Sequence, residues 1–237
     1  MFTGNSPDTK AFKSSFDTKI MDFVNVSDLT TYIFCPRFLY FRLKFGDEYI
    51  TEMHAAREIY LSIRKGFDNN WAVERFKQLY GKDNLSVFSN ALQKFRYDPM
   101  LDEFRPLDWE IKLESNKLKL KGILDEIVIF KNKKLPLTLS LKEPEKGNVW
   151  FKDLIKIASF CMLLEVNEGL VYYCFDGSLK RVEISRREKY QILKLIERVF
   201  KVKKGFVPEK REDLRCKNCV YAETCNSKPS TFASKFL

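Results

Sequence analysis

The sequence is poor in several features that mark common protein classes. No apolar run approaches the ~20 residues that a membrane-spanning helix needs, and residues 1–19 contain no apolar signal core. We therefore expect neither a membrane protein nor a secreted one, but a cytoplasmic protein whose cysteines stay reduced or bind metals. Glutamine occurs only three times, and His54 is the only histidine. Beside plentiful Lys and Glu, the scarcity of glutamine favours a thermophilic source and AT-rich codon usage equally.

The composition indicates a folded, strongly basic protein. Hydrophobic residues make up 45% of the 237 positions, enough for a proper core, and the length suits one large domain or one domain with appended helices. Lys and Arg number 42 against 32 Asp and Glu, which gives a net charge of +10. Such an excess favours a polyanionic partner, of which nucleic acid is the commonest and a membrane surface the alternative.

The hydrophobic pattern changes period along the chain. Helices are expected from an N-cap at Ser27 through Phe34, and over 52–80, 84–97, 151–166 and 186–204. Strands are expected over 109–113, 118–130, 135–142, 170–175 and 180–184. This order predicts an α/β fold with a mixed sheet flanked by helices. We divide the chain into a flexible arm (1–20), a helical lobe (21–100), an α/β core (101–205) and a cysteine knuckle with a tail (206–237).

Three cysteines lie close together near the end of the sequence. Cys216 and Cys219 are separated by two residues, and Cys225 follows after five more. Three thiolates cannot complete a tetrahedral metal site or a cubane cluster, so a fourth ligand must come from elsewhere. Cys35, which precedes a proline among aromatic residues, is the natural candidate. The four cysteines therefore predict one metal centre.

The other two cysteines, Cys161 and Cys174, lie in apolar segments and are predicted to be core residues. Thiolate ligands suit zinc and iron–sulfur clusters alike. Zinc sites, however, are usually built from two short hooks, whereas here a single cysteine precedes the triplet by about 180 residues. That layout favours an iron–sulfur cluster joining two distant segments, with zinc as the alternative.

The segment Tyr32-Ile33-Phe34-Cys35-Pro36-Arg37-Phe38-Leu39-Tyr40, together with Cys216-x2-Cys219-x5-Cys225, resembles the CRISPR-associated RecB-like exonucleases. The chain is also similar to the nuclease domains of the wider iron–sulfur RecB/AddB group. The resemblance spans roughly residues 24–226. It implies a restriction-endonuclease-like fold of the PD-(D/E)XK superfamily and a 4Fe-4S cluster on the four cysteines. It further implies DNA ends, single-stranded or duplex, and CRISPR integrase subunits as partners.

The same resemblance implies an active site. His54 stands where the family has a histidine, and Asp125 matches the aspartate of its Gly-x-x-Asp strand motif, here beginning at Gly122. His54 and Asp125 would bind Mn²⁺ or Mg²⁺ together with a backbone carbonyl near Leu141. The metal would lower the pKa of a bound water for phosphodiester hydrolysis, and Lys142 would assist.

Two of the family's catalytic elements, which span three positions, differ in this chain. Ser140 replaces a carboxylate, and a neutral hydroxyl is a poor ligand for Mg²⁺ or Mn²⁺. Lys156 and Phe160 replace a glutamine and a tyrosine. Glu143 or Glu145 would have to replace the missing acid, although Glu143 is expected on the opposite strand face from Lys142.

Three hypotheses follow. The protein is a metal-dependent exonuclease that trims DNA ends for CRISPR adaptation, a weakly active or inactive paralogue that binds DNA as a scaffold, or a zinc-stabilised DNA-binding protein. In each case basic side chains should contact DNA. The candidates are Arg37, Arg42, Lys44, Lys156 and Lys203.

Overall fold

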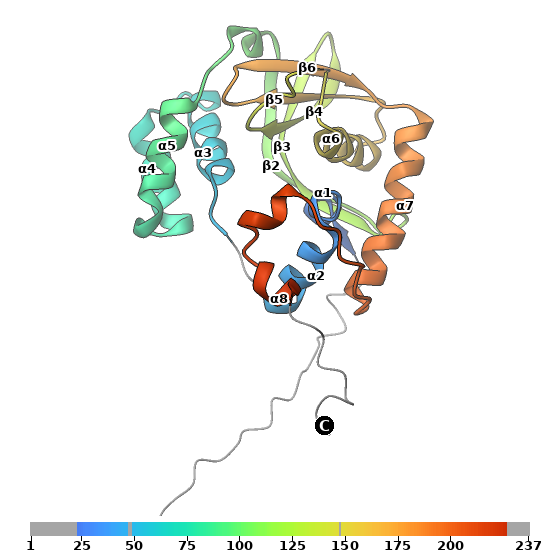
Figure 1. Ribbon diagram of the computed structural model, residues 1–237. Coiled ribbons are helices and arrows are strands. Elements are labelled where there is room, and N and C mark those ends of the chain that lie inside the picture. The colour runs from blue at the N-terminus through green and yellow to red at the C-terminus, as the bar shows by residue number, and fades with distance from the viewer. Residues whose placement is uncertain (1–22, 47–48, 147, 227–237) are drawn as a thin grey trace, which may run out of the picture.

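A computed structural model describes residues 23–46, 49–146 and 148–226 (Figure 1). Within these ranges the chain forms a six-stranded mixed sheet with helices on both faces. The predicted α/β class, with helices flanking a mixed sheet, is therefore confirmed. The arm predicted for residues 1–20 and the final residues 227–237 lie outside the described part of the chain.

The strands are β1 (Val24–Asn25), β2 (Arg105–Ser115), β3 (Leu120–Phe130), β4 (Lys133–Ser140), β5 (Glu168–Tyr173) and β6 (Ser178–Glu183). The helices are α1 (Val26–Phe34), α2 (Pro36–Phe45), α3 (Glu52–Arg64), α4 (Asn69–Tyr80), α5 (Leu85–Lys94), α6 (Phe151–Leu163), α7 (Arg186–Lys203) and α8 (Ala222–Asn226). Short 3₁₀ helices are η2 (Lys82–Asn84), η3 (Pro99–Glu103) and η4 (Leu214–Asn218).

Strand β3 is the centre of the sheet. It pairs antiparallel with β2 along its length, parallel with β1 near its start, and antiparallel with β4 near its end. The β3–β4 turn places Lys131 and Asn132 at φ of 47° and 62°, the two left-handed residues that a tight hairpin favours. Strand β4 then pairs parallel with β5 after α6 has crossed over, and β6 closes the sheet antiparallel to β5.

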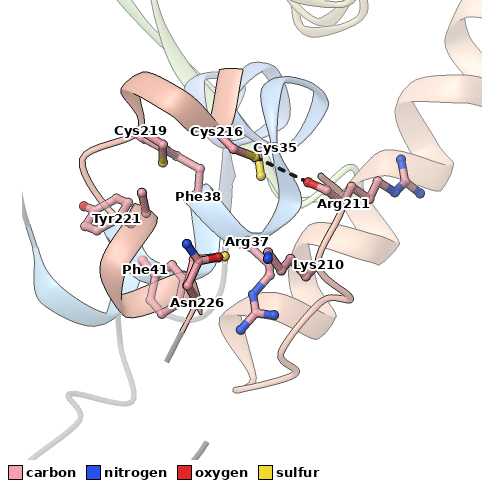
Figure 2. A pocket seen from close by; sticks show the side chains of 12 residues that line it. Cys35, Arg37, Phe38, Phe41, Lys210, Arg211, Cys216, Cys219, Tyr221 and Asn226 are labelled. Atoms are coloured by element: carbon pink, nitrogen blue, oxygen red, sulfur yellow. Dashed lines mark hydrogen bonds between the residues drawn. The ribbon is translucent and has the colours of Figure 1, made fainter. Parts of the chain in front are cut away.

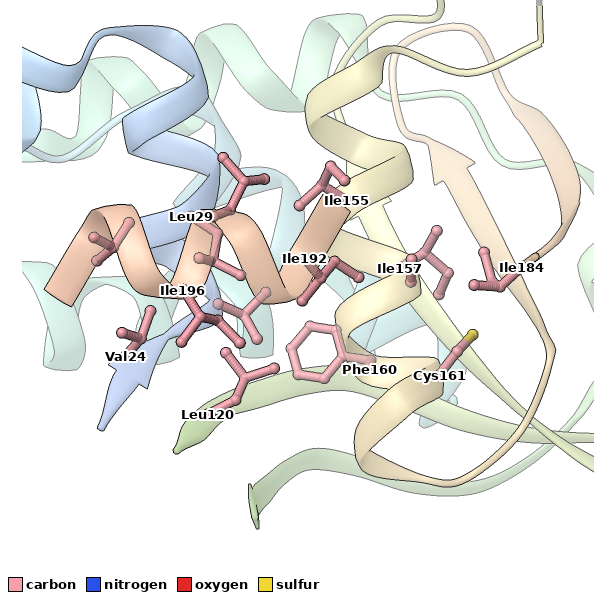
Figure 3. Close-up of a cluster of buried hydrophobic side chains, with 14 of the residues drawn as sticks. Val24, Leu29, Leu120, Ile155, Ile157, Phe160, Cys161, Ile184, Ile192 and Ile196 are labelled. Atoms are coloured by element: carbon pink, nitrogen blue, oxygen red, sulfur yellow. The ribbon is translucent and has the colours of Figure 1, made fainter. Parts of the chain in front are cut away.

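Each face of the sheet has its own hydrophobic core. Helices α1, α6 and α7 cover one face, and α3, α4 and α5 lie over the other (Figure 1). Strand β5 serves both, since Val171 and Tyr173 belong to the first core, while Leu170 and Tyr172 belong to the second. Figure 3 shows the first core, in which side chains from β1, α1, β3, α6 and α7 meet.

Two glycines let helices approach the sheet closely. A Cβ atom on Gly169 would lie 2.6 Å from Ile157 Cγ1 of α6, so a larger residue there would push the helix away. A Cβ atom on Gly122 would lie 3.0 Å from Val26 Cγ2. Cys161, on the same helix as Ile157, is fully buried, which confirms that it is a core residue. Cys174 is likewise buried in the second core.

Two predicted helix boundaries were wrong. The first helix begins at Val26 rather than after Ser27, because Asn25 is its N-cap and the Asn25 amide donates to Asp28 Oδ2 at 3.1 Å. The helix predicted over 52–80 is broken into α3 and α4. Gly66 adopts a φ of 73°, and the Asp68 side chain caps α4 by accepting a hydrogen bond from the Trp71 amide at 2.9 Å.

Candidate functional site

A groove crosses the C-terminal end of β4, between α3 and the first turns of α6. It consists of two adjoining hollows of about 430 and 540 Å³ that share Met53, Ser140 and Lys152. The first hollow is also lined by Arg57 and Lys156. The second is lined by Lys94, Lys142, Trp150 and Phe175, among others. Of the positions implied by the nuclease resemblance, Ser140, Lys142, Lys156 and Phe160 line this groove.

Asp125 lies beneath the first hollow with only 2% of its side chain exposed. Its Oδ1 atom accepts a hydrogen bond from Arg57 Nε at 2.7 Å. Its Oδ2 atom accepts from the Leu139 amide and from Lys156 Nζ, both at 2.9 Å. Both carboxylate oxygens are therefore engaged by protein donors, two of which carry a positive charge.

Lys156 makes a second contact within the same site. Its Nζ atom donates to the Leu139 carbonyl at 3.0 Å, so the ammonium bridges a carboxylate oxygen and a backbone oxygen. Burial on its own raises the pKa of the Asp125 carboxyl, but the charges of Arg57 and Lys156, together with the hydrogen bonds from the Leu139 amide and Lys156, outweigh burial and lower that pKa to about 2. Asp125 is consequently ionised and paired at any physiological pH.

Ser140 stands where the family has a carboxylate, and a carboxylate from another residue lies beside it. Its Oγ atom donates to Asp153 Oδ2 of α6 at 2.9 Å, and Asp153 is buried. Burial raises the pKa of the Asp153 carboxyl, against the opposing charge of Lys152. The hydrogen bond to Ser140 gives this buried acid a partner within the protein.

The groove as folded does not fit the divalent metal that the resemblance implies. A metal ion would need oxygens of Asp125 and of a neighbouring carbonyl, and each of these oxygens already accepts a hydrogen bond from a protein donor, from a cationic side chain in every case. Among residues 23–46, 49–146 and 148–226, no three His, Cys, Asp or Glu side chains form a group able to hold a metal ion.

His54, which the resemblance implies as a metal ligand with Asp125, lines a different hollow from the one above Asp125. His54 Nδ1 accepts a hydrogen bond from the Thr51 amide at 3.1 Å at the start of α3, and its ring packs against Tyr80. Asp28 and Arg42 line the same hollow as His54. The α3 side chain that reaches Asp125 is Arg57, one turn further along.

The strand predicted over 135–142 ends earlier than expected, because β4 ends at Ser140 and Lys142 lies beyond it. Lys142 is exposed beyond the strand, and its carbonyl accepts a hydrogen bond from Trp150 Nε1 at 2.9 Å. A backbone carbonyl near Leu141 was expected to bind the metal, and the Leu141 carbonyl itself accepts a hydrogen bond from the Phe175 amide.

The acids suggested as replacements for the missing carboxylate were Glu143 and Glu145. Glu143 pairs with Lys180 of β6 at 2.7 Å and accepts a hydrogen bond from Ser178 Oγ at 3.0 Å. It is thereby held towards β6, and neither acid lines the two hollows of the groove.

The four cysteines predicted to bind a metal centre line one small cavity of about 40 Å³ (Figure 2). Cys35 lies at the junction of α1 and α2, Cys216 lies in η4, Cys219 directly follows η4, and Cys225 lies in α8. All four are free thiols. The fold thus brings the distant Cys35 to the C-terminal triplet.

Three cationic residues, Arg37, Lys210 and Arg211, line the cavity beside the cysteines. The Nε atom of Arg37 is buried and has no hydrogen-bond partner among the described residues. A buried donor without a partner is costly, and a negatively charged thiolate centre in this cavity would provide one. The four thiols as they lie in this structure do not themselves form a group able to hold a metal ion, and it is the cationic lining and the unpartnered donor that favour a metal–thiolate group here.

The knuckle that carries the cysteine triplet is held to the start of the fold by other contacts as well. Arg215 Nη1 donates to the Phe34 carbonyl at 2.6 Å. The ring of Tyr221 packs against Phe38 and Phe41 of α2, with centroids 5.0 and 5.5 Å apart. In Figure 1 the red C-terminal segment accordingly lies beside the blue α2.

The predicted DNA-binding residues occupy varied positions. Arg42 pairs with buried Asp28 at 2.8 Å, and Lys203 lies 3.6 Å from the same carboxylate and donates to the Phe23 carbonyl. Lys44 is exposed on α2, whereas Arg37 lines the cysteine cavity and Lys156 binds Asp125. Their contact with DNA stays a prediction.

Arg57 and Asp153 were missed by sequence reasoning. Arg57 follows His54 by three positions, so the sequence predicts that both lie on the same side of α3. A charged residue in a helix usually points into solvent, however, and Arg57 was therefore not singled out. Asp153 precedes Lys156 by three positions on α6. Only the register of α6 against β4 shows that it lies beside Ser140.

No helix in the described ranges is both long and apolar enough to span a membrane. No protein-family model matches the sequence. The chain is 41% identical over 214 residues to an "Uncharacterized protein" of Archaeoglobus fulgidus, covering 90% of this chain and all of the relative.

Among the solved structures that match this chain are the following two. A crystal structure of a "Putative exonuclease" from Eubacterium rectale is similar with a TM-score of 0.56 and 12% identity, covering 97% of this chain and 98% of that one. At this identity the likeness shows a shared fold. The crystal structure of SSO0001 matches with a TM-score of 0.42 and 15% identity over 87% of this chain and 86% of that one.

Proposed function

This chain belongs to the same protein family as the Archaeoglobus fulgidus protein, and we propose that it is a DNA-binding protein that does not cleave DNA with a divalent metal. In this proposal a nuclease-like fold serves as a scaffold that binds DNA ends along the groove. The Eubacterium rectale structure supports the fold, and the functional assignment comes from this chain's own side chains.

One observation carries the proposal: Lys156 Nζ bridges Asp125 Oδ2 and the Leu139 carbonyl. Metal-assisted phosphodiester hydrolysis requires an ion held by free oxygen ligands next to the scissile phosphate. Here Asp125, the acid best placed to bind such an ion, already pairs with the cations of Arg57 and Lys156. Ser140 adds a hydroxyl where a second carboxylate is needed.

The lining of the groove supports DNA binding. Lys142 and Lys152 present ammonium groups along it, and Trp150 is 45% exposed at its edge. Basic side chains attract the phosphate backbone, while an exposed aromatic ring offers a stacking surface for an unpaired base. The net charge of +10 acts in the same direction.

We further propose that Cys35, Cys216, Cys219 and Cys225 hold a 4Fe-4S cluster, with zinc as the alternative. When bound, the group supplies four metal–thiolate bonds that join α1 and α2 to the knuckle. The cysteine cavity and its three cationic residues support a metal–thiolate centre. Iron and labile sulfide in anaerobically prepared protein identify a cluster, and stoichiometric zinc identifies the alternative.

The cysteine frame also supports a finer proposal. Its resemblance to the CRISPR-associated RecB-like group suggests that the scaffold acts in the cytoplasm beside CRISPR integrase subunits, as a subunit that selects DNA ends. Co-purification of the chain with the integrase subunits of its own genome, and its loss on Cys35→Ser, would test this association.

The proposed function is tested by measuring binding and cleavage in parallel. Labelled single-stranded and duplex DNA are incubated with wild-type protein and Asp125→Ala in Mn²⁺ or Mg²⁺. We expect binding but no cleavage by wild type. Metal-dependent cleavage that disappears in Asp125→Ala would overturn the proposal.

Variants of the groove locate the binding surface. Lys142→Glu should weaken binding and reduce the salt dependence by about one phosphate contact, a slope of roughly 0.7–0.9. Lys112→Glu on β2 is the matched control, because it makes the same charge change on an exposed residue outside the groove. Equal losses in both variants would show that only the overall charge matters.

A further inference from the structure

Lys156 is placed as a divalent cation would be. Carboxylate and backbone carbonyl oxygens are the usual ligands of hard divalent cations, and Lys156 Nζ lies 2.9 Å from Asp125 Oδ2 and 3.0 Å from the Leu139 carbonyl oxygen. Arg57 contacts the other carboxylate oxygen at 2.7 Å. Together the two side chains bring two positive charges to Asp125, which equals the charge of one divalent ion.

The side chains of Lys156 and Arg57 are largely shielded from water. Only 19% of the Lys156 side chain and 31% of Arg57 are exposed, against 2% of Asp125. A charge pair with so little access to water is screened weakly by salt. The very low pKa of Asp125 agrees with strong pairing.

An ionised carboxylate at the floor of a DNA-binding groove repels phosphate unless its charge is compensated. Metal-dependent sites obtain that compensation from the bound ion. We infer that Lys156 and Arg57 permanently replace a divalent ion as the counter-charge of Asp125, so that the groove binds a phosphodiester backbone without metal. This inference rests on the proposed function, because it concerns the same groove.

The charge around the first hollow agrees with metal-independent binding. Arg57, Lys152 and Lys156 supply three positive charges against the carboxylates of Asp125 and Asp153. Burial raises the pKa of Asp153, and a raised pKa can only lower the negative charge that Asp153 carries. The hollow is therefore net positive with no added ion.

Binding of labelled single-stranded DNA is measured in EDTA and in millimolar Mg²⁺ at constant ionic strength. Wild-type affinity should agree between the two conditions within about twofold. In Lys156→Gln, affinity in EDTA should fall about tenfold, as expected for one lost charged contact, and Mg²⁺ should recover much of it. The Mg²⁺ would occupy the oxygens that Lys156 vacates.

Lys152→Gln is the matched control, because Lys152 lines the same hollow from the same helix. It should weaken binding equally in EDTA and in Mg²⁺, and any screening of the DNA by Mg²⁺ is common to both variants. Identical Mg²⁺ responses of Lys152→Gln and Lys156→Gln would overturn the inference.

Direct Mn²⁺ titration followed by electron paramagnetic resonance separates this inference from the proposed function, because it needs no DNA. Lys156→Gln should bind Mn²⁺, and adding Asp125→Asn should abolish that binding. Wild type and Lys156→Arg should bind none at this site.

Should Lys156→Gln fail to fold, Mn²⁺ titration of the wild-type protein still tests the inference. Mn²⁺ bound by wild type and lost in Asp125→Asn would refute the inference, and its absence supports it. A wild-type protein that binds neither Mn²⁺ nor DNA would refute the proposed function, and with it the metal-independent binding of DNA, while the role of Lys156 and Arg57 as counter-charge of Asp125 would stand.

Discussion

Replacing Asp125 by asparagine should destabilise the protein in a way that depends on pH. Asparagine keeps the size of the side chain but removes the charge that pairs with Arg57 and Lys156. In the folded protein the pKa of Asp125 is lowered from its ordinary 3.8 to about 2. By linkage, a shift of that size contributes about 2 kcal/mol to the free energy of unfolding.

The sign of the pH dependence follows from the direction of the shift. A carboxyl group with a lowered folded pKa stabilises the fold above its unfolded pKa, near pH 4, and that contribution is lost as the pH falls through about 2. Wild type should therefore exceed Asp125→Asn by about 2 kcal/mol at neutral pH. The difference should shrink towards zero near pH 2, where protonated aspartic acid and asparagine are alike.

Urea denaturation of both proteins over this pH range measures the difference directly. Any acid loss of a bound metal centre is common to both proteins and cancels. Asp83→Asn is the control, because Asp83 is exposed on η2. A difference between wild type and Asp125→Asn that stayed constant from neutral pH to about pH 2 would refute the ion pairing.

Three further changes test other parts of the molecule. Cys35→Ser should lose most of the bound iron or zinc measured by elemental analysis, whereas Cys161→Ser should retain it because Cys161 is buried in the core. Gly169→Ala should lower the urea midpoint by the equivalent of about 1–3 kcal/mol, since the added methyl group meets Ile157; an unchanged midpoint would contradict this close approach. Trp150→Ala should weaken single-stranded DNA binding by about 1–3 kcal/mol in titrations, while Trp150→Phe retains most of it; equal losses would exclude stacking.

The sequence predicted the fold class because hydrophobic period is a local property. The helix over 151–166 and the strands around it were recognised from spacing alone, and the bounds of α6, β5 and β6 differ from those ranges by at most three residues. The break between α3 and α4 was missed because the apolar spacing continues past it. The left-handed Gly66 and the Asp68 cap decide that break.

The candidate site was predictable in part for the same reason. Asp125 and the change at Ser140 can be read from a strand pattern. The bond from Lys156 to Asp125 joins residues 31 positions apart, and the bond from Arg57 joins residues 68 apart. Such pairs depend on how α3 and α6 pack against the sheet, and no local sequence pattern determines that packing. Lys156 was consequently interpreted as a DNA contact.

The attachment of the knuckle to α2 has a consequence for how the chain matures. Phe38 and Phe41 are covered by Tyr221, which is synthesised about 180 residues later. While the ribosome is still translating the sheet, this aromatic face and the Cys35 thiol stand uncovered in the nascent chain. A segment translated late thus covers one translated early, and a chain truncated before residue 216 would leave this apolar face and the Cys35 thiol exposed to aggregation and oxidation.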